Sequence, residues 1–108
     1  SGKAKREFLY VDDLADAIIF LLNKKIKTEI LNIGSGQEVS IKNLAYKIKK
    51  ITKFKGNIIF DKKKPDGTPR RIVNSSKLKK MGWKPKTNLD NGIKKTYNYF
   101  SNIYSSIQ

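Results

Sequence analysis

The sequence contains no cysteine and no histidine among its 108 residues. Without cysteine the chain has no disulfide, no thiolate nucleophile and no thiolate zinc site. Without histidine it lacks both the commonest general base and the commonest metal ligand. Its nine acidic residues are scattered and show no recognisable metal-ligand spacing. Catalysis by this chain alone is therefore not expected.

Long hydrophobic runs are also lacking. The longest, residues 17–22, is too short to span a bilayer, and no secretory signal is present. A chain of 108 residues can form one core, but it is small for an enzyme that needs both a cofactor site and a substrate site. We therefore expect a single cytoplasmic domain over residues 1–108.

Charge is abundant but one-sided, with 24 basic residues against nine acidic ones and a net charge of +15. Such an excess favours an anionic partner, such as nucleic acid, a phosphorylated ligand or an acidic membrane surface. The lysines, however, are spread over every expected element, as solvated residues would be. Against this background the three arginines, Arg6, Arg70 and Arg71, mark positions where a planar guanidinium fork is required, which lysine cannot supply.

Two long helices are expected in the first half of the chain. The first begins near Asp12 and Asp13, which we expect to cap it and oppose its dipole. Its apolar residues extend around more than one face as far as residue 22, so this helix should be buried on more than one side. Ser40 is expected to cap the second helix, which has a single apolar stripe over residues 41–51 and lysines on its other face.

Two further helices are expected near the C-terminus. Residues 74–76 offer caps for a short helix that ends at Gly82. Trp83 lies in this stop signal and not among clustered aromatic residues, so we interpret it as a core anchor and not as a stacking platform. Thr87 is expected to cap the last helix, in which apolar residues recur at helical intervals over 89–104 and whose end should fray.

Strands are expected at residues 7–10, 29–33 and 57–60, because each is a short, mostly apolar run bounded by turn residues. The Gly-Ser-Gly sequence at 34–36 invites comparison with phosphate-binding loops. It lacks the third glycine of a dinucleotide fingerprint and no Gly-Lys-Ser/Thr follows, so we interpret it as the turn that ends a strand. Strands alternating with helices predict an α/β fold.

The loop 64–71 (KPDGTPRR) combines a rigid backbone with placed charges. Two prolines of fixed φ bracket the tight turn at Asp66 and Gly67, so the loop should lose little entropy on binding. Asp66 can accept hydrogen bonds from a diol or from the N–H edge of a base, while Arg70 and Arg71 can bind phosphate. From the loop alone, a solvated turn that binds nothing is an equal alternative.

Several segments together carry a family resemblance: 2–8 (GKAKREF), 11–15 (VDDLA), 32–36 (NIGSG), 38–42 (EVSIK), 64–70 (KPDGTPR), 76–78 (SKL) and 82–83 (GW). Through them, nearly the whole chain resembles the C-terminal part of the GDP-L-fucose synthases, which are extended short-chain dehydrogenases/reductases of the NAD-dependent epimerase/dehydratase family. The entry to the first helix and the Asn-Ile-Gly turn are shared among nucleotide-sugar epimerases and dehydratases. The loop 64–70 is more particular to the fucose synthases.

The resemblance implies a substrate-binding lobe that closes over a GDP-sugar. Arg6 matches a substrate-binding arginine of the family, placed by its chemistry at the pyrophosphate. Asp66 matches a substrate-binding acid suited to ribose hydroxyls or the guanine edge. Arg71 stands at a position that is often lysine in the family. Arg70 matches the basic residue before that position. Either can neutralise phosphate, and the resemblance leaves open which of the two faces the ligand.

The resemblance also implies parts that this sequence lacks. Family members bind NADP in an N-terminal Rossmann domain, which holds the catalytic Ser, Tyr, Lys, Cys and His, and the longer enzyme is expected to form a homodimer. Epimerisation at C3 and C5 and NADPH-dependent reduction at C4 of the sugar would therefore need that domain, and this chain alone would not be catalytic. A chain without it should either expose an apolar patch where the domain would pack or rearrange to cover that patch.

Two alternative functions stay open. The chain could be the lobe of another nucleotide-sugar epimerase or dehydratase, with a different base and sugar. It could also be a basic nucleic-acid-binding module, which only the net charge favours, since no nucleic-acid motif is present. The GDP-sugar hypothesis makes a geometric demand: the rigid loop and Arg6 must converge on the same diphosphate, on one side of the molecule and with a hollow between them.

Overall fold

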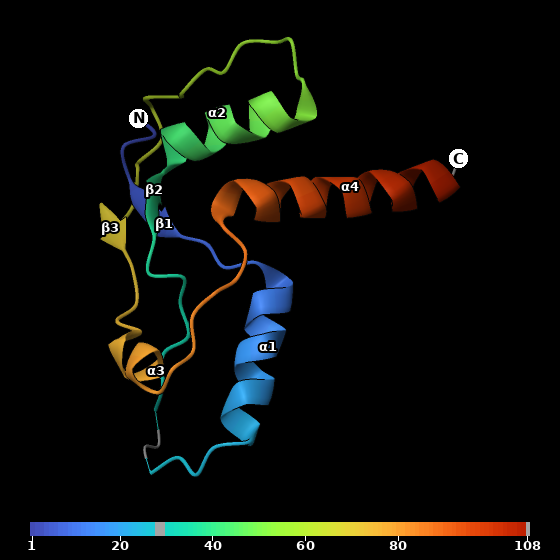
Figure 1. Cartoon of the computed structure of the whole chain (residues 1–108). Helices are drawn as coiled ribbons and strands as arrows, with labels where there is room; N and C mark the ends of the chain where they lie inside the picture. Colours follow the sequence, from blue (N-terminus) through green and yellow to red (C-terminus); the bar gives the residue numbers. More distant parts are fainter. Residues whose placement is uncertain (28–29, 108) are drawn as a thin grey trace.

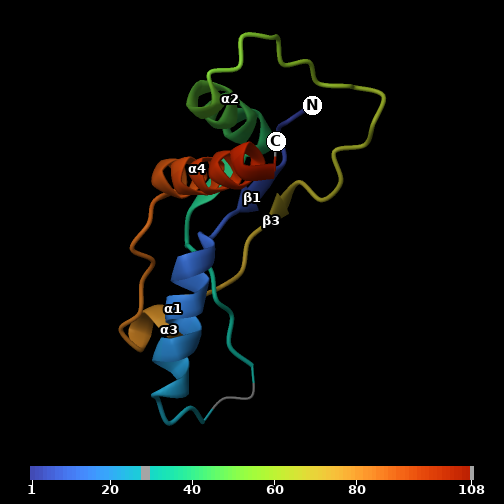
Figure 2. The same ribbon diagram turned by 90° about the vertical axis from the view of Figure 1, so that its right-hand side faces the viewer.

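The computed structural model describes residues 1–27 and 30–107, in which a small sheet lies beside helices in an α/β arrangement, as predicted (Figure 1). The elements, in chain order, are β1 (Lys5–Glu7), α1 (Val11–Leu22), β2 (Glu38–Ser40), α2 (Ile41–Thr52), β3 (Arg70–Arg71), α3 (Ser76–Lys80) and α4 (Leu89–Ile107). Helices α2 and α4 lie side by side at one end, and α1 and α3 lie at the other (Figures 1 and 2). No helix in these described ranges is long and apolar enough to cross a membrane.

The sheet has the order β2-β1-β3, with β1 in the centre. Strand β1 pairs antiparallel with β2, where Arg6 lies opposite Val39. It pairs parallel with β3, where Lys5 lies opposite Arg70 and Arg6 opposite Arg71. The sheet thus brings the loop that follows α2 back to the first residues of the chain.

The strand predictions were largely wrong. Strand β1 occupies Lys5–Glu7 in place of the expected 7–10, and residues 30–33 and 57–60 have no strand structure. Residue 29, the start of one expected strand, lies outside the described residues. The strands that do form are two or three residues long and rich in charged residues, so they carry no apolar pattern that could have indicated them.

The helix α1 begins without the expected aspartate cap. Its N-cap residue is Tyr10, whose side chain caps nothing, although the acidic first turn is present as predicted. Asp13 is instead buried and accepts hydrogen bonds from the backbone N–H of Thr87 (2.8 Å) and from its hydroxyl (3.4 Å). Thr87 therefore does not cap α4; the side chain of Asn88 does, accepting from the N–H of Asn91 at 2.9 Å.

The other helix signals were confirmed. The hydroxyl of Ser40 accepts from the N–H of Asn43 at 3.1 Å and so caps α2. Gly82 ends α3 with a φ of 100°, and the N–H of Trp83 then donates back to the carbonyl of Leu78 at 3.3 Å. This is the Schellman arrangement that the Gly-Trp pair predicted.

The core joins α1 to α3 and the segment behind it. Ala17, Leu78 and Trp83 are buried, and residues such as Phe20 and Leu31 pack around them. Trp83 is thus the core anchor that the sequence predicted. Its indole N–H donates to the carboxylate of Asp16 at 2.9 Å, which satisfies the polar atom that burial would otherwise leave unpaired. This bond, followed by that of Lys86, lowers the pKa of Asp16.

The molecule is flat and open, with extents of 50 × 38 × 19 Å and a radius of gyration of 16.8 Å. A compact domain of this length has a radius of gyration of about 13 Å. Helix α1 is not buried on several sides: Ile19 is 59% exposed and Leu22 76%. The expected apolar patch is therefore present. Residues 53–69 contain no helix or strand and form a long excursion between α2 and β3 (Figure 2).

Candidate functional site

The pairing of β1 with β3 brings two of the three arginines together. Arg6 and Arg71 are partners in the parallel ladder, as are Lys5 and Arg70. Successive residues of a strand point to opposite faces, so Arg6 and Arg71 share one face of the sheet while Lys5 and Arg70 share the other. Two guanidinium groups from distant parts of the sequence therefore lie on neighbouring strands.

The guanidinium of Arg6 is anchored at one nitrogen. Its Nη1 donates to the carbonyl of Lys5 at 2.7 Å and to that of Thr68 at 2.8 Å. In the described part of the chain, Nε and Nη2 have no hydrogen-bond partner, which leaves three of the five guanidinium donors for a ligand. Because Thr68 lies in the loop 64–71, the contact to its carbonyl also fixes this loop against β1.

The tight turn expected at Asp66 and Gly67 is not formed: the turn of this segment lies at Lys62 and Lys63, and residues 65–67 are irregular. Gly67 nevertheless lies beside the guanidinium of Arg6. Gly67 adopts a φ of 69°, and a Cβ built on it would lie 4.0 Å from Nη2 of Arg6. The adjacent carboxylate of Asp66 is exposed and accepts hydrogen bonds from the ammonium and hydroxyl groups of Ser1, which lower its pKa. Arg6 and the loop 64–71 thus lie together, as the sequence hypothesis required. The hollow that it also required was not confirmed, because Arg6, Asp66 and Arg71 line none of the main cavities of the described residues.

Arg70 and Arg71 differ in what they contact. Nε of Arg70 donates to the carboxylate of Glu38 at 2.7 Å, and Nζ of Lys5 donates to the same carboxylate at 3.3 Å. The hydrogen bond from Arg70 is the main cause of a lowered pKa at Glu38. The guanidinium of Arg71 is exposed and makes no hydrogen bond or ion pair within residues 1–27 and 30–107. The geometry therefore places Arg71, and not Arg70, beside Arg6.

Glu7 was not among the predicted site residues, although it belongs to the Arg-Glu-Phe sequence that carried the family resemblance. Its carboxylate accepts from the backbone N–H of Gly36 at 2.6 Å and from that of Val73 at 3.1 Å. The turn 34–36 is thus held by a carboxylate, and the N–H that a phosphate would need is already used. This contact agrees with the prediction that the turn is not a phosphate-binding loop.

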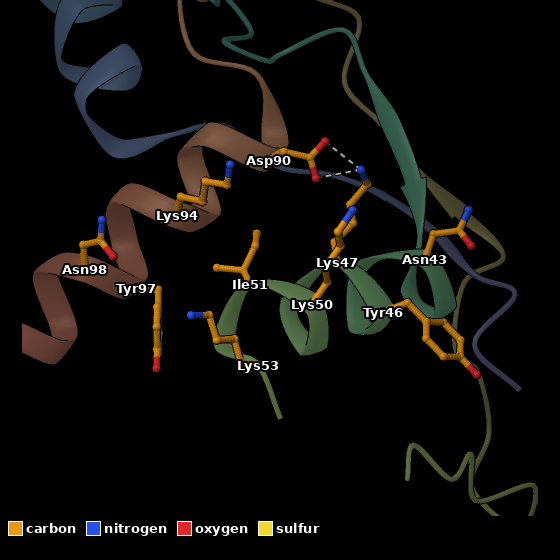
Figure 3. Close-up of a pocket in the computed structure, with 10 residues that line it drawn as sticks. All are labelled: Asn43, Tyr46, Lys47, Lys50, Ile51, Lys53, Asp90, Lys94, Tyr97 and Asn98. Atoms are coloured by element: carbon orange, nitrogen blue, oxygen red, sulfur yellow. Dashed lines mark hydrogen bonds and ion pairs between the residues drawn. The ribbon is translucent and has the colours of Figure 1, made fainter. Parts of the chain in front are cut away.

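A basic cavity of about 880 Å³ lies between α2 and α4, away from these arginines (Figure 3). Lys47 and Asp90 bridge the two helices at 2.8 Å, and Tyr97 and Ile51 project into the space between them (Figure 3). A second cavity, of about 620 Å³ and mainly apolar, lies between α2, α4 and the segment that leads into α1. None of Arg6, Asp66, Arg70 and Arg71 lines either cavity.

The candidate site is therefore an open surface, not a closed pocket. Arg6 is half-buried, whereas Asp66 and Arg71 are exposed. Such a surface can hold an anion from one side only. A ligand enclosed on both sides would need atoms from outside this chain.

Comparison with known proteins shows which protein families this chain is similar to. Residues 1–34 match the NAD dependent epimerase/dehydratase family. The chain is 50% identical over 107 residues to the probable GDP-L-fucose synthase 1 of Oryza sativa subsp. japonica, covering 98% of this chain and 33% of that protein. The chain thus spans about a third of the length of the curated relatives it matches.

Solved structures agree. A GDP-L-fucose synthetase from Naegleria fowleri superimposes with a TM-score of 0.90 at 28% identity, over 97% of this chain and 33% of that one. A UDP-glucose 4-epimerase from Thermotoga maritima, solved with UDP-glucose, gives a TM-score of 0.85 at 28% identity, over 96% and 34%. The α/β arrangement found here is that of the C-terminal part of such enzymes.

Proposed function

We propose that this chain, which over nearly its whole length matches the C-terminal third of GDP-L-fucose synthases of the NAD-dependent epimerase/dehydratase family, is the GDP-sugar-binding domain of such an enzyme. The observation that carries the proposal is the pairing of Arg6 with Arg71, with Gly67 of the same loop beside the guanidinium of Arg6. Residues 1–108 are then one substrate-binding domain.

In this proposal, the residues of the site contact different parts of the GDP-sugar or support the sheet. Arg6 and Arg71 hold the diphosphate, since charge-assisted bonds from two strands restrain it more than one would. Asp66 is exposed, and the lone pairs of its carboxylate that Ser1 does not use accept from ribose hydroxyls or from the guanine N–H edge. Arg70, named with them from the sequence, is kept at the opposite face by Glu38 and supports the sheet.

The chemistry belongs to the rest of the longer enzyme. Epimerisation of GDP-4-keto-6-deoxymannose followed by reduction with NADPH would need a Rossmann domain to bind the cofactor. The residues described here do not fit that role, because the glycine turn 34–36 presents its N–H to Glu7. This chain would contribute orientation: it fixes the diphosphate so that the sugar extends toward the catalytic domain.

Other parts of the assignment remain predictions. A homodimeric longer enzyme is what the family resemblance implies, whereas a cytoplasmic location is the expectation from the sequence, which has no secretory signal and no long apolar run. The exposed apolar residues of α1 support packing against an N-terminal Rossmann domain, since contiguous exposed apolar surface marks interaction sites.

Titration calorimetry of the chain with GDP-L-fucose tests the proposal. Arg6→Ala and Arg71→Ala should each weaken binding by about 1.5–3 kcal/mol, the value of a hydrogen bond to a charged group. Arg70→Ala is the matched control, an adjacent arginine on the opposite face, and should leave affinity unchanged. Circular dichroism of each variant should match that of the wild type.

Two further titrations separate the alternatives. Equal or tighter binding of UDP-glucose would favour a different nucleotide-sugar epimerase or dehydratase. Preference for a short DNA duplex, with affinity falling steeply as salt rises, would favour the nucleic-acid-binding module and contradict the GDP-sugar assignment. Loss of affinity in Arg70→Ala but not in Arg71→Ala would reverse the assignment of the two arginines.

A further inference from the structure

The sheet alone fixes Arg71 weakly. Strand β3 has two residues and β1 has three, and short ladders of this kind give little stability without other contacts. The chain before β3 has no helix or strand over residues 53–69, and no helix or strand follows until α3. Something beyond the ladder must keep Arg71 in register with Arg6.

On the entry side of β3, Arg6 donates to the carbonyl of Thr68, and Arg70 within β3 binds Glu38. On the exit side, the contact comes from Glu7. Glu7 follows Arg6 directly in β1, and its Oε2 accepts from the N–H of Val73, two residues after Arg71, at 3.1 Å. Its Oε1 accepts from the N–H of Gly36 at 2.6 Å and from the hydroxyl of Ser35 at 3.4 Å. One side chain thus joins the central strand, the exit of β3 and the glycine turn.

The packing around this carboxylate is tight. A Cβ built on the buried Gly34 would lie 2.6 Å from Oε1 of Glu7 and 2.7 Å from a methyl group of Val73. Only a residue without a side chain leaves room for the carboxylate to reach both amides. The glycine is therefore needed here for its small size.

Both oxygens of Glu7 must accept. Two backbone N–H groups from different segments point at the two oxygens, which suits a carboxylate because it has only acceptors. A carboxamide of the same size would present an NH₂ group to one of these N–H groups, and one donor would lose its partner. Bonds to a charged acceptor are also stronger than bonds to a neutral one.

We propose that Glu7 is a positioning residue: by holding the exit of β3 against β1, it keeps Arg71 beside Arg6 and so sets the geometry of the diphosphate site. This role rests on the proposed function of that site. Glu7 itself does not touch the ligand in this proposal, because its oxygens are occupied by the protein's own donors.

Glu7→Gln tests the role, and Glu38→Gln is the matched control. Glu38 is the residue opposite Glu7 in the β1–β2 ladder, but its hydrogen bonds come from side chains and not from backbone N–H groups. Amide hydrogen exchange measured by NMR should be about tenfold faster in Glu7→Gln at whichever of Gly36 and Val73 loses its acceptor. It should be unchanged at both amides in Glu38→Gln.

Affinity for GDP-L-fucose tests the link to the site. Glu7→Gln should weaken binding about tenfold. Adding Glu7→Gln to Arg71→Ala should cause little further loss, because a residue that acts through Arg71 has no effect once the guanidinium is gone. Losses that simply add would mean that Glu7 acts elsewhere and would overturn the proposal.

The proposed function and the role of Glu7 can each be refuted without the other. A wild-type chain that does not bind GDP-L-fucose refutes the proposed function, whereas normal binding with unchanged exchange at Gly36 and Val73 in Glu7→Gln refutes only the role of Glu7. Should Glu7→Gln fail to fold, Glu7→Asp keeps the charge and shortens the side chain by one methylene. Faster exchange at one or both amides then supports the role, and unchanged exchange contradicts it.

Discussion

Acidic side chains are the scarce partners in this basic chain. Nine acids face 24 basic residues, so the loss of one carboxylate cannot be replaced by a neighbour as the loss of one lysine can. Asp13 joins α1 to the start of α4, and Asp16 receives both Trp83 and Lys86. The fold therefore depends more on its few acids than on its many lysines.

Glu38 should make the stability of the chain depend on pH. Its pKa lies below the ordinary value of 4.5 because Arg70 donates to the ionised form. Stabilisation is then fully present above the ordinary value and is lost as the pH falls through the lowered value in the folded state. Wild type should exceed Glu38→Gln in unfolding free energy at neutral pH, and this difference should shrink below pH 4.5. Urea denaturation at several pH values measures it; a constant difference would contradict the prediction.

For the candidate site, the sequence indicated which residues to consider but not which of them lie together. The scarcity of arginine singled out Arg6, Arg70 and Arg71, and the proline-bracketed turn singled out Asp66. The choice between Arg70 and Arg71 depends on which strand β3 joins and in which direction. That pairing links residues far apart in sequence, so no local pattern contains it.

Helix ends show how single backbone positions shape the elements. Helices α2 and α3 both end with a residue of positive φ, followed by an N–H that reaches back to the last turn. In α3 this residue is Gly82, but in α2 it is Lys53, with a φ of 56°. A residue with a Cβ is strained in this left-handed region, so glycine in place of Lys53 should relieve strain at the end of α2.

Opposite substitutions at these two ends should have opposite effects. Lys53→Gly should raise the unfolding free energy by about 0.5–1 kcal/mol, because relief of the left-handed strain exceeds the added entropy of the unfolded chain. Gly82→Ala should lower it by a similar amount, since a Cβ there meets open space and only the backbone conformation is penalised. Urea denaturation checks both.

Lys50→Gly, within α2, is the control for this pair. It removes a lysine without relieving any strain and should destabilise by about 0.5–1 kcal/mol, as glycine does inside a helix. If Lys53→Gly and Lys50→Gly destabilise alike, the end of α2 is not strained.

Helices were predictable from sequence because their signals are local. Apolar residues at a spacing of 3.6, the Ser40 cap and the Gly82 stop all lie within a few residues of the helix they define. The strands could not be predicted in this way, because β1 and β3 are held together by backbone pairing between distant residues and by contacts of Glu7. The apolar runs at 30–33 and 57–60 met no strand partner within the described chain. Both runs are irregular: Leu31 and Ile33 pack against the core, whereas Ile59 is 87% exposed.

The molecule as a whole is more open than its length requires. Its core is small, and α1 and α4 leave large apolar side chains exposed, among them Ile19 and Tyr99. Surface of this kind normally marks contact with another protein or domain. In isolation it should drive copies of the chain together.

Ile19→Glu should make the isolated chain less prone to self-association. Ile19 is 59% exposed on α1, so the unfolding free energy should change by less than about 0.5 kcal/mol, as for most surface substitutions. Analytical ultracentrifugation over a range of concentrations measures the association. Asn98→Glu on α4 makes the same charge change and leaves the α1 face intact. Equal effects of both variants would show that charge, not apolar surface, controls association.

The excursion over residues 53–69 separates the two arginines along the chain while the sheet joins them in space. A single proteolytic cut within residues 61–64 would place Arg6 on one peptide and Arg71 on the other. Neither peptide would hold both arginines of the proposed site, so under the proposed function nucleotide binding would return only when both halves reassembled. Two fragments cut there would therefore form a split protein, and their affinity for the ligand would measure how far they reassemble.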